Sequence, residues 1–152
     1  MLIEVKIEDW DSADGMRLRE EQRAELDARY GCDDHEPGAG PSAENIAVFL
    51  VARDRGGRAV GCGGLRLLGA ASAEIKRMYV VPEARGAGVS VAVLRELEAA
   101  ALRLGVRILK LETGPAQPDA IRFYEREGYR RIANFGVYRR EPLSRCFARH
   151  LG

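Results

Sequence analysis

Two glycines and an arginine stand in the segment PEARGAGVS, residues 82–90, where an apolar strand is expected to give way to a helix. Glycine is a poorer helix cap than Ser, Thr, Asp or Asn, and it costs about 1 kcal/mol inside a helix. A strand–loop–helix junction directs unpaired backbone N–H groups at one point, where the helix dipole favours an anion. Glycine lets this backbone approach phosphate oxygens closely, and Arg85 adds a cationic, forked donor. The segment therefore predicts a pyrophosphate-binding loop, with a turn that serves only chain geometry as the alternative.

The same segment lacks the marks of two common nucleotide sites. No G-K-[ST] follows the glycines, which disfavours hydrolysis of a magnesium-bound nucleotide. The spacing is not G-x-G-x-x-G with a later acidic residue, which disfavours a dinucleotide-binding fold. The loop is therefore expected to be a phosphate-binding loop of another kind.

A second cluster strengthens this interpretation. In the C-terminal third, Ala120 is followed by Phe-Tyr-Glu at residues 123–125 and by Gly-Tyr at residues 128–129. Together with the glycine loop, this order and spacing resembles the GNAT superfamily of acetyl-CoA-dependent N-acetyltransferases. That family's pyrophosphate motif has Arg or Gln, two residues, Gly, one residue, then Gly or Ala, which the loop matches except at its last position, Ser90. The resemblance covers about residues 46–132.

The resemblance implies acetyl-CoA as co-substrate and no metal. Backbone groups of the strand before the loop are expected to contact the pantetheine arm, and the loop is expected to bind the pyrophosphate. The implied cofactor-binding residues are Met78, Tyr79, Val80, Arg85, Gly86, Ala87, Gly88, Val89, Ser90, Gln117, Ala120 and Phe123. Two of them depart from the family pattern, because Ser90 replaces a usual Gly or Ala and Gln117 stands where Asn is frequent.

The resemblance also implies direct attack of an amine on the thioester carbonyl, with Tyr124 as the general acid beside the sulfur. A thiol titrates near pH 8.5 and a phenol near pH 10, so proton transfer between them is not far from balanced. Tyr124 follows Ala120 by four residues, which places both on one helical face. The alternative is a buried tyrosine whose hydroxyl merely finds a partner.

For the general base, Glu74 is expected first, because family members often carry an acidic residue on this strand, acting through water. Glu112 on the next strand is the second candidate. The alternatives are a solvated surface glutamate at Glu74 and a partner of Lys110 or an arginine at Glu112. Strand alternation predicts one face that carries Glu74, Lys76, Met78 and Val80.

Periodicity and turn residues organise these candidates into one mixed α/β domain that spans residues 1–152. With the resemblance, they imply a GNAT-like fold, a central mixed, mostly antiparallel sheet of about seven strands flanked by helices. Strands are expected at residues 3–8, 46–54, 58–68, 73–81, 106–113, 129–140 and 143–151, and helices at 12–30, 89–104 and 119–127. The loop at residues 31–45 is expected to shape the acceptor site. The last strand is expected to offer an edge at which a homodimer can form.

Composition bounds the remaining possibilities. The net charge of +1 gives no general attraction to nucleic acid or to an anionic membrane, and no apolar stretch approaches the roughly 20 residues of a membrane span. The three cysteines, Cys32, Cys62 and Cys146, form no C-x-x-C pair, which favours reduced thiols in the cytoplasm. Only His35 and His150 are present, which disfavours a histidine-rich metal site. Cys62 and Cys146 are expected in the core.

The leading hypothesis is a cytoplasmic acetyl-CoA-dependent N-acetyltransferase that acts on an amine of a small molecule or peptide. The alternative is a CoA-binding module without turnover, which serves as a sensor or interaction domain. A nucleic-acid-binding module is disfavoured by the charge balance. Tyr138 is expected either to line the acceptor cleft or to pack on the sheet as a strand residue. Arg77 is expected either to grip an acceptor carboxylate or to be a surface cation.

Overall fold

Seven strands form one open sheet in the computed structural model, which describes residues 2–31 and 37–152. Their spatial order is β1-β2-β3-β4-β5-β7-β6, and every neighbouring pair is antiparallel except β4 and β5. The strands are β1 (Glu4–Ile7), β2 (Val48–Arg53), β3 (Ala59–Gly69), β4 (Ser72–Val80), β5 (Ile108–Thr113), β6 (Arg130–Ile132) and β7 (Arg145–His150), and the helices are α1 (Ala13–Tyr30), α2 (Val89–Arg103) and α3 (Pro118–Arg126). This mixed, mostly antiparallel sheet with its three helices confirms the predicted fold class.

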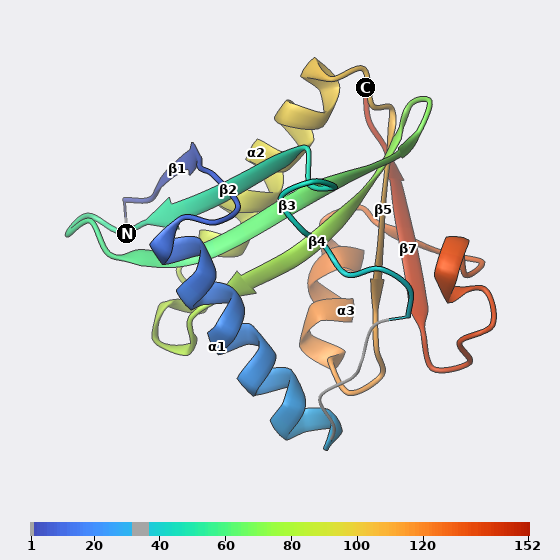
Figure 1. Ribbon diagram of the computed structural model, residues 1–152, viewed down its shortest axis with the longest axis horizontal. Coiled ribbons are helices and arrows are strands. Elements are labelled where there is room, and N and C mark those ends of the chain that lie inside the picture. Colours follow the sequence, from blue (N-terminus) through green and yellow to red (C-terminus); the bar gives the residue numbers. More distant parts are fainter. Residues whose placement is uncertain (1, 32–36) are drawn as a thin grey trace.

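The two longer helices cover opposite faces of the sheet, α1 in front and α2 behind in Figure 1. Ser12 caps α1, because its hydroxyl accepts a hydrogen bond from the Gly15 N–H at 3.1 Å. Helix α2 packs closely against β3, where a Cβ at Gly63 would lie 3.0 Å from side-chain atoms of Val93 and Leu97. The sheet is therefore the middle layer of three, and both of its faces carry core residues.

Strands β4 and β5 run side by side for only three residue pairs before they diverge. The parallel register joins Ser72 to Ile108 and Glu74 to Lys110, whereas β4 continues to Val80. Parallel neighbours need a crossover connection, which α2 supplies here. In Figure 1, α3 is seen between the diverging strands. The divergence opens the sheet near its centre, and the candidate site is built there.

A β-bulge in β4 breaks the alternation of side chains that the sequence predicts. Opposite the single residue Gly63 of β3, β4 places both Arg77 and Met78, and Arg77 takes the left-handed conformation at φ 58°. The extra residue shifts the alternation, so Lys76 and Val80 lie on opposite faces of the sheet. For this reason the prediction of a single face that carries Glu74, Lys76, Met78 and Val80 is wrong.

The C-terminal third differs from the prediction in two ways. The strand expected at residues 129–140 ends at Ile132, because Gly136 takes a φ of 54° and begins a 3-10 turn. That turn buries Tyr138, which is therefore not a strand residue. Strand β7 lies between β5 and β6, so the last strand is not the sheet edge that was expected for a dimer. A homodimer through another surface remains a prediction.

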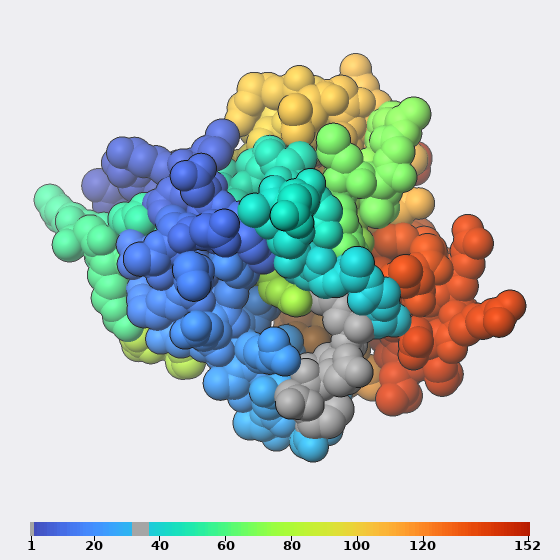
Figure 2. Space-filling model, viewed as in Figure 1, coloured from blue at the N-terminus to red at the C-terminus, as the bar shows by residue number. Residues whose placement is uncertain are grey.

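The face that carries α1 is shown in Figure 2. On this face α1 (blue) and the C-terminal segment (red) lie on either side of residues 37–45 (cyan). Residues 37–45 contain no helix or strand, as predicted for this loop. Cys32 and His35, with the rest of residues 32–36, lie outside the described part of the chain. The role of the whole loop in shaping an acceptor site therefore stays a prediction.

Several features expected from composition can be examined in residues 2–31 and 37–152. Among them, no helix is both long enough and apolar enough to cross a bilayer. The same residues hold no group of three His, Cys, Asp or Glu side chains arranged to bind a metal ion. Cys62 and Cys146 are buried free thiols, as predicted, and burial raises the pKa of Cys62 to about 12. Both therefore act as small core residues.

Candidate active site

The glycine loop leaves the N-terminus of α2 open. After a short 3-10 turn at residues 82–84, Gly86 and Gly88 take positive φ values of 81° and 85°. A Cβ at either glycine would meet no atom within 4 Å, so glycine is needed for its conformation and not for lack of space. Gly88 is the N-cap residue of α2, which begins at Val89, and glycine has no side chain that could cap the helix. Its first N–H groups are therefore left for a ligand or solvent.

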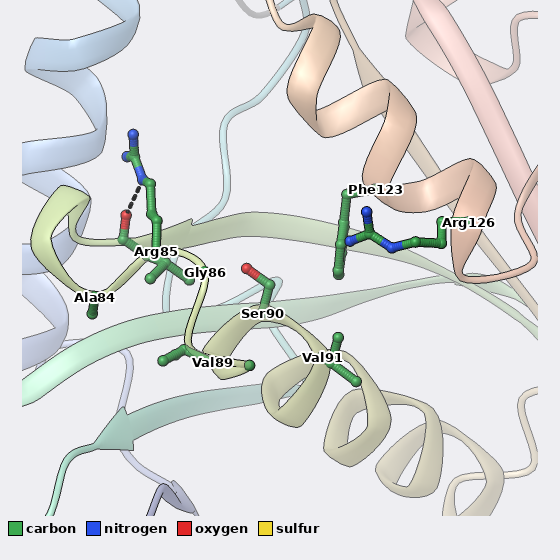
Figure 3. Close-up of a pocket in the computed structure, with 10 residues that line it drawn as sticks. Ala84, Arg85, Gly86, Val89, Ser90, Val91, Phe123 and Arg126 are labelled. Atoms are coloured by element: carbon green, nitrogen blue, oxygen red, sulfur yellow. Dashed lines mark hydrogen bonds between the residues drawn. The ribbon is translucent and has the colours of Figure 1, made fainter. Parts of the chain in front are cut away.

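A pocket of about 210 Å³ lies beside this loop and is called the loop pocket below. It is lined by Val80, Ala84, Arg85, Gly86, Gly88, Val89, Ser90, Val91, Phe123 and Arg126. Figure 3 shows Ser90 and Val91 on α2 across from Phe123 and Arg126 on α3. Backbone N–H groups on one side and a guanidinium on the other make this pocket suited to an anion.

The guanidinium of Arg85, which was expected to be the cation of the loop, is held by other protein groups. Its Nε donates to the carbonyl oxygen of Val80 at 2.9 Å, and its Nη2 pairs with Glu25 of α1 at 2.7 Å. Figure 3 shows the first of these bonds and the side chain turned away from Ser90. Arg126 was not predicted from the sequence, although its place three residues after Phe123 puts both on one helical face.

A larger cavity of about 830 Å³ opens where β4 and β5 diverge and is called the central cleft below. Its walls come from α1, β4, β5, α3 and the segments at residues 37–41 and 141–144. The predicted residues that line it are Met78, Glu112, Gln117, Ala120 and Tyr124. Lys76 and Arg77 line it as well, so Arg77 is not simply a surface cation.

Helix α3 borders both cavities. Ala120 and Tyr124 line the central cleft, whereas Phe123 and Arg126 line the loop pocket. Residues four apart and three apart share a face of a helix, so the two pairs form two neighbouring stripes. One nine-residue helix therefore connects the anion-binding end of the site with its central cleft.

Tyr124 is buried, with 7% of its surface exposed, and still lines the central cleft. Its ring packs edge-on against Phe123 at 5.1 Å and Tyr129 at 5.6 Å between centroids. Burial raises the pKa of Tyr124 above the ordinary value of a tyrosine. The hydroxyl therefore stays protonated at every ordinary pH and can act as a hydrogen-bond donor.

Glu74 is 2% exposed and is not among the residues that line the central cleft, so the alternative of a solvated surface glutamate is wrong. Its strand is central and covered on both faces. The carboxylate accepts hydrogen bonds from the Tyr138 hydroxyl at 2.5 Å and from Arg66 at 3.0 Å. Lys76 lies 3.5 Å from the same carboxylate and donates to the Tyr138 hydroxyl at 3.1 Å. Through Lys76 this buried cluster reaches the cleft wall.

Tyr138 thus fits neither of its two expected roles. It does not line the central cleft, and it is not a strand residue that packs on the sheet. Its hydroxyl instead joins Glu74 and Lys76 across more than sixty positions of sequence. No local pattern indicates such a contact.

Glu112, the second candidate for the base, lines the central cleft from β5. The Ser144 hydroxyl donates a hydrogen bond to its Oε2 at 2.8 Å. Lys110, which the sequence offered as a partner, has its Nζ 5.3 Å from the ring centroid of Phe135. Of the two candidate bases, Glu112 is therefore the residue that lines the central cleft.

Of the remaining predicted residues, some line the central cleft and others line neither cavity. Gln117 lines the central cleft and donates to the hydroxyl of Tyr30 at the end of α1, at 3.4 Å. Met78 also lines that cleft, and its carbonyl oxygen accepts a hydrogen bond from Gln22 of α1 at 2.8 Å. Tyr79, Ala87 and Glu74 line neither cavity.

The last residues of the second motif, Gly128 and Tyr129, anchor α3 to the rest of the site. Gly128 turns the chain at φ 97°, and the Tyr129 hydroxyl donates to Glu98 of α2 at 2.8 Å. Arg149 of β7 also donates to Glu98, at 2.7 Å. Through Glu98 this cluster joins α2 to the segment that follows α3.

Comparison with known proteins is consistent with this geometry. The family model described as "Acetyltransferase (GNAT) family" matches residues 6–129. An IAA acetyltransferase of Azospirillum brasilense is 40% identical over 97 residues, which cover 63% of this chain and 63% of that protein. The chain thus matches less than two thirds of the length of this curated relative.

Solved structures share the fold over nearly the whole chain. A Klebsiella pneumoniae protein, named provisionally as an acyl-CoA N-acyltransferase, superposes with a TM-score of 0.85 at 28% identity, covering 99% of both chains. A GNAT family acetyltransferase of Elizabethkingia anophelis with acetyl-CoA bound gives a TM-score of 0.71 at 15% identity, covering 98% of both chains. At that identity the second likeness concerns the fold alone.

Proposed function

The chain belongs to the GNAT acetyltransferase family, and from this premise we propose that it transfers the acetyl group of acetyl-CoA to an amine of a small molecule or peptide. The observation that carries the proposal is the position of α3. This helix borders the loop pocket with Phe123 and Arg126 and the central cleft with Ala120 and Tyr124. A cofactor with a pyrophosphate at one end and a thioester at the end of a long arm needs such a pair of adjoining cavities.

In this proposal the pyrophosphate binds at the N-terminus of α2. The uncapped N–H groups after Gly88 and the helix dipole favour the anion, and Arg126 supplies the cation. The pantetheine arm then runs along the open side of β4. Small Ala120 leaves room for the arm beside Tyr124.

The proposed reaction is a direct acyl transfer. The neutral amine nitrogen attacks the carbonyl carbon and the new C–N bond forms. The C–S bond then breaks to release the thiolate of CoA, and the proton that the new amide nitrogen must lose passes to this thiolate. Tyr124 donates its hydroxyl hydrogen bond to the departing sulfur. Because burial raises the pKa of Tyr124, complete proton transfer to a thiolate with a pKa near 8.5 is uphill, and stabilisation by the hydrogen bond is its main contribution.

The amine must lose a proton to become a nucleophile. We assign this step to Glu112, because this residue lines the central cleft and its carboxylate accepts a hydrogen bond from the Ser144 hydroxyl. Glu74, the first candidate from sequence, is instead proposed to position Lys76 and Tyr138 from within the buried cluster. Glu74 is then a positioning residue, which its substitution can reveal.

The proposal is tested by release of free thiol from acetyl-CoA in the presence of a panel of amines, with calorimetry of acetyl-CoA binding on the same protein. Amine-dependent thiol release supports the transferase. Binding of acetyl-CoA without turnover of any amine would favour the alternative, a sensor or interaction module. Absence of acetyl-CoA binding would contradict both.

A further inference from the structure

The side chain of Gln22 reaches from α1 to β4, where the sheet opens. Its Nε2 donates a hydrogen bond to the carbonyl oxygen of Met78 at 2.8 Å. The other end of the same amide, Oε1, is buried and has no hydrogen-bond donor within residues 2–31 and 37–152. A buried carbonyl oxygen without a donor is rare in folded proteins and costs free energy, so it calls for an explanation.

The orientation of this amide is fixed by its partner. Turning the amide of Gln22 by 180° would bring Oε1 against the Met78 carbonyl, and two acceptors would face each other. The N–H₂ group therefore belongs at Met78, and the unpartnered acceptor belongs on the other side. Met78 stands in the β-bulge of β4, where pairing with β3 is interrupted, which leaves its carbonyl oxygen for Gln22.

The surroundings of Gln22 indicate where a donor can come from. Gln22 lines the central cleft together with Met78, Ala120 and Tyr124. Under the proposed function, the thioester end of the cofactor and the attacking amine meet in this cleft. Both bring N–H groups, one from the amides of the pantetheine arm and one from the acceptor nitrogen.

We propose that Oε1 of Gln22 accepts a hydrogen bond from an N–H group of a bound substrate. This inference rests on the proposed function and adds a binding residue that the sequence motifs do not contain. The Nε2 bond to Met78 holds the amide in place before the substrate arrives, so the acceptor is oriented in advance.

The experiment compares Gln22→Met, which keeps the length of the side chain and removes both polar ends, with Gln22→Glu, which keeps an acceptor oxygen. Ala24→Met is the matched control, because Ala24 is exposed on the same helix and lines neither cavity. Calorimetry gives the Kd of acetyl-CoA, steady-state kinetics gives the KM of the best amine, and thermal melting verifies that each variant is folded.

For Gln22→Met we expect one of the two constants to rise about tenfold, as for the loss of one hydrogen bond. A higher KM for the amine at unchanged Kd identifies the acceptor nitrogen as the donor. A higher Kd for acetyl-CoA at unchanged KM identifies a pantetheine amide. Gln22→Glu keeps an acceptor oxygen but loses the hydrogen bond to Met78, so it is expected to lose less affinity than Gln22→Met. Ala24→Met is expected to behave as the unmodified protein.

Two results would overturn the inference. In folded Gln22→Met protein, an unchanged Kd together with an unchanged KM means that Oε1 meets only solvent. Equal losses in Gln22→Met and Gln22→Glu mean that the amide only ties α1 to Met78. Wild-type protein that binds acetyl-CoA without turnover refutes the proposed transferase, while the Kd of the variants still decides the role of Gln22.

Discussion

The loop pocket and the central cleft are assembled from different kinds of contact. Most of the loop pocket comes from one continuous stretch, residues 80–91, which includes the uncapped N-terminus of α2. The central cleft takes its walls from α1, two strands that diverge, α3 and two loops. Its polar groups are side chains whose partners lie far away in the sequence.

Because of this difference, substitutions in the two cavities are expected to change different measured quantities. In the loop pocket, a substitution acts on backbone conformation and on the anion, so cofactor affinity is the sensitive quantity. In the central cleft, polar side chains are paired with groups from distant segments, as Glu112 is with Ser144 and Gln117 with Tyr30. Rates, pH dependence and affinity must therefore be measured together there.

The largest expected effect is in the central cleft, at Glu112. We expect Glu112→Gln to lower the rate at neutral pH by about 10²–10⁴-fold, the usual range for general base catalysis, and by less at high pH, where the amine is already deprotonated. Glu74→Gln is the comparison variant. We expect it to lower the rate by a smaller factor than Glu112→Gln does, and by the same factor at every pH. The pH profile of kcat/KM measures both. A pH-dependent loss of kcat/KM in Glu74→Gln but not in Glu112→Gln would identify Glu74 as the general base.

The next effect concerns the loop pocket. We expect Gly88→Glu to weaken acetyl-CoA binding by about 10²-fold or more, because it adds negative charge at the N-terminus of α2 and a side chain at φ 85°. Gly105→Glu is a matched control at the other end of α2, with φ 82° and no atom within 4 Å of its Cβ. Calorimetry measures the affinity of both folded variants for acetyl-CoA. Equal affinities in the two would contradict the assignment of the loop pocket as the pyrophosphate site.

Tyr124 lines the central cleft from α3, the helix that borders both cavities, and its substitution is expected to affect the chemical step more than binding. We expect Tyr124→Phe to slow single turnover by about 10–10²-fold, with acetyl-CoA affinity changed by less than about tenfold. Because burial raises the pKa of Tyr124, the ratio of the two rates is expected to stay constant from pH 7 to about pH 10. A mutant with the wild-type rate would identify Tyr124 as a packing residue only.

The smallest effect separates the two arginines of the loop pocket. We expect Arg126→Gln to weaken acetyl-CoA binding about tenfold at low salt and less at high salt, through loss of one charge-assisted hydrogen bond. Arg85→Gln is expected to weaken it by less than about threefold, because that guanidinium is already held by Glu25 and Val80. Arg122→Gln is the control, since Arg122 is exposed on α3 and lines neither cavity. The reverse order of affinities would make Arg85 the phosphate ligand.

The features that the sequence determined are local ones. The positive φ angles of Gly86 and Gly88 and the facing of Ala120 and Tyr124 follow from residues only a few positions apart. Backbone conformation and helical phase depend on such neighbours, so motif, periodicity and resemblance were enough to predict the loop and the lining of α3. The strands were predicted from their own patterns and turns, and the mixed sheet from the resemblance, whereas the position of β7 between β5 and β6 was not predicted.

Only the tertiary structure decided which atoms are available to a ligand. The bulge at Arg77 places Val80 on the face opposite Lys76. Glu25 pairs with the guanidinium of Arg85, and the Tyr138 hydroxyl donates a hydrogen bond to buried Glu74. These partners are brought together by the packing of α1 and the C-terminal segment on the sheet. A charged or polar side chain binds whichever complementary group the fold places within about 3 Å, and sequence spacing contains no information on that distance.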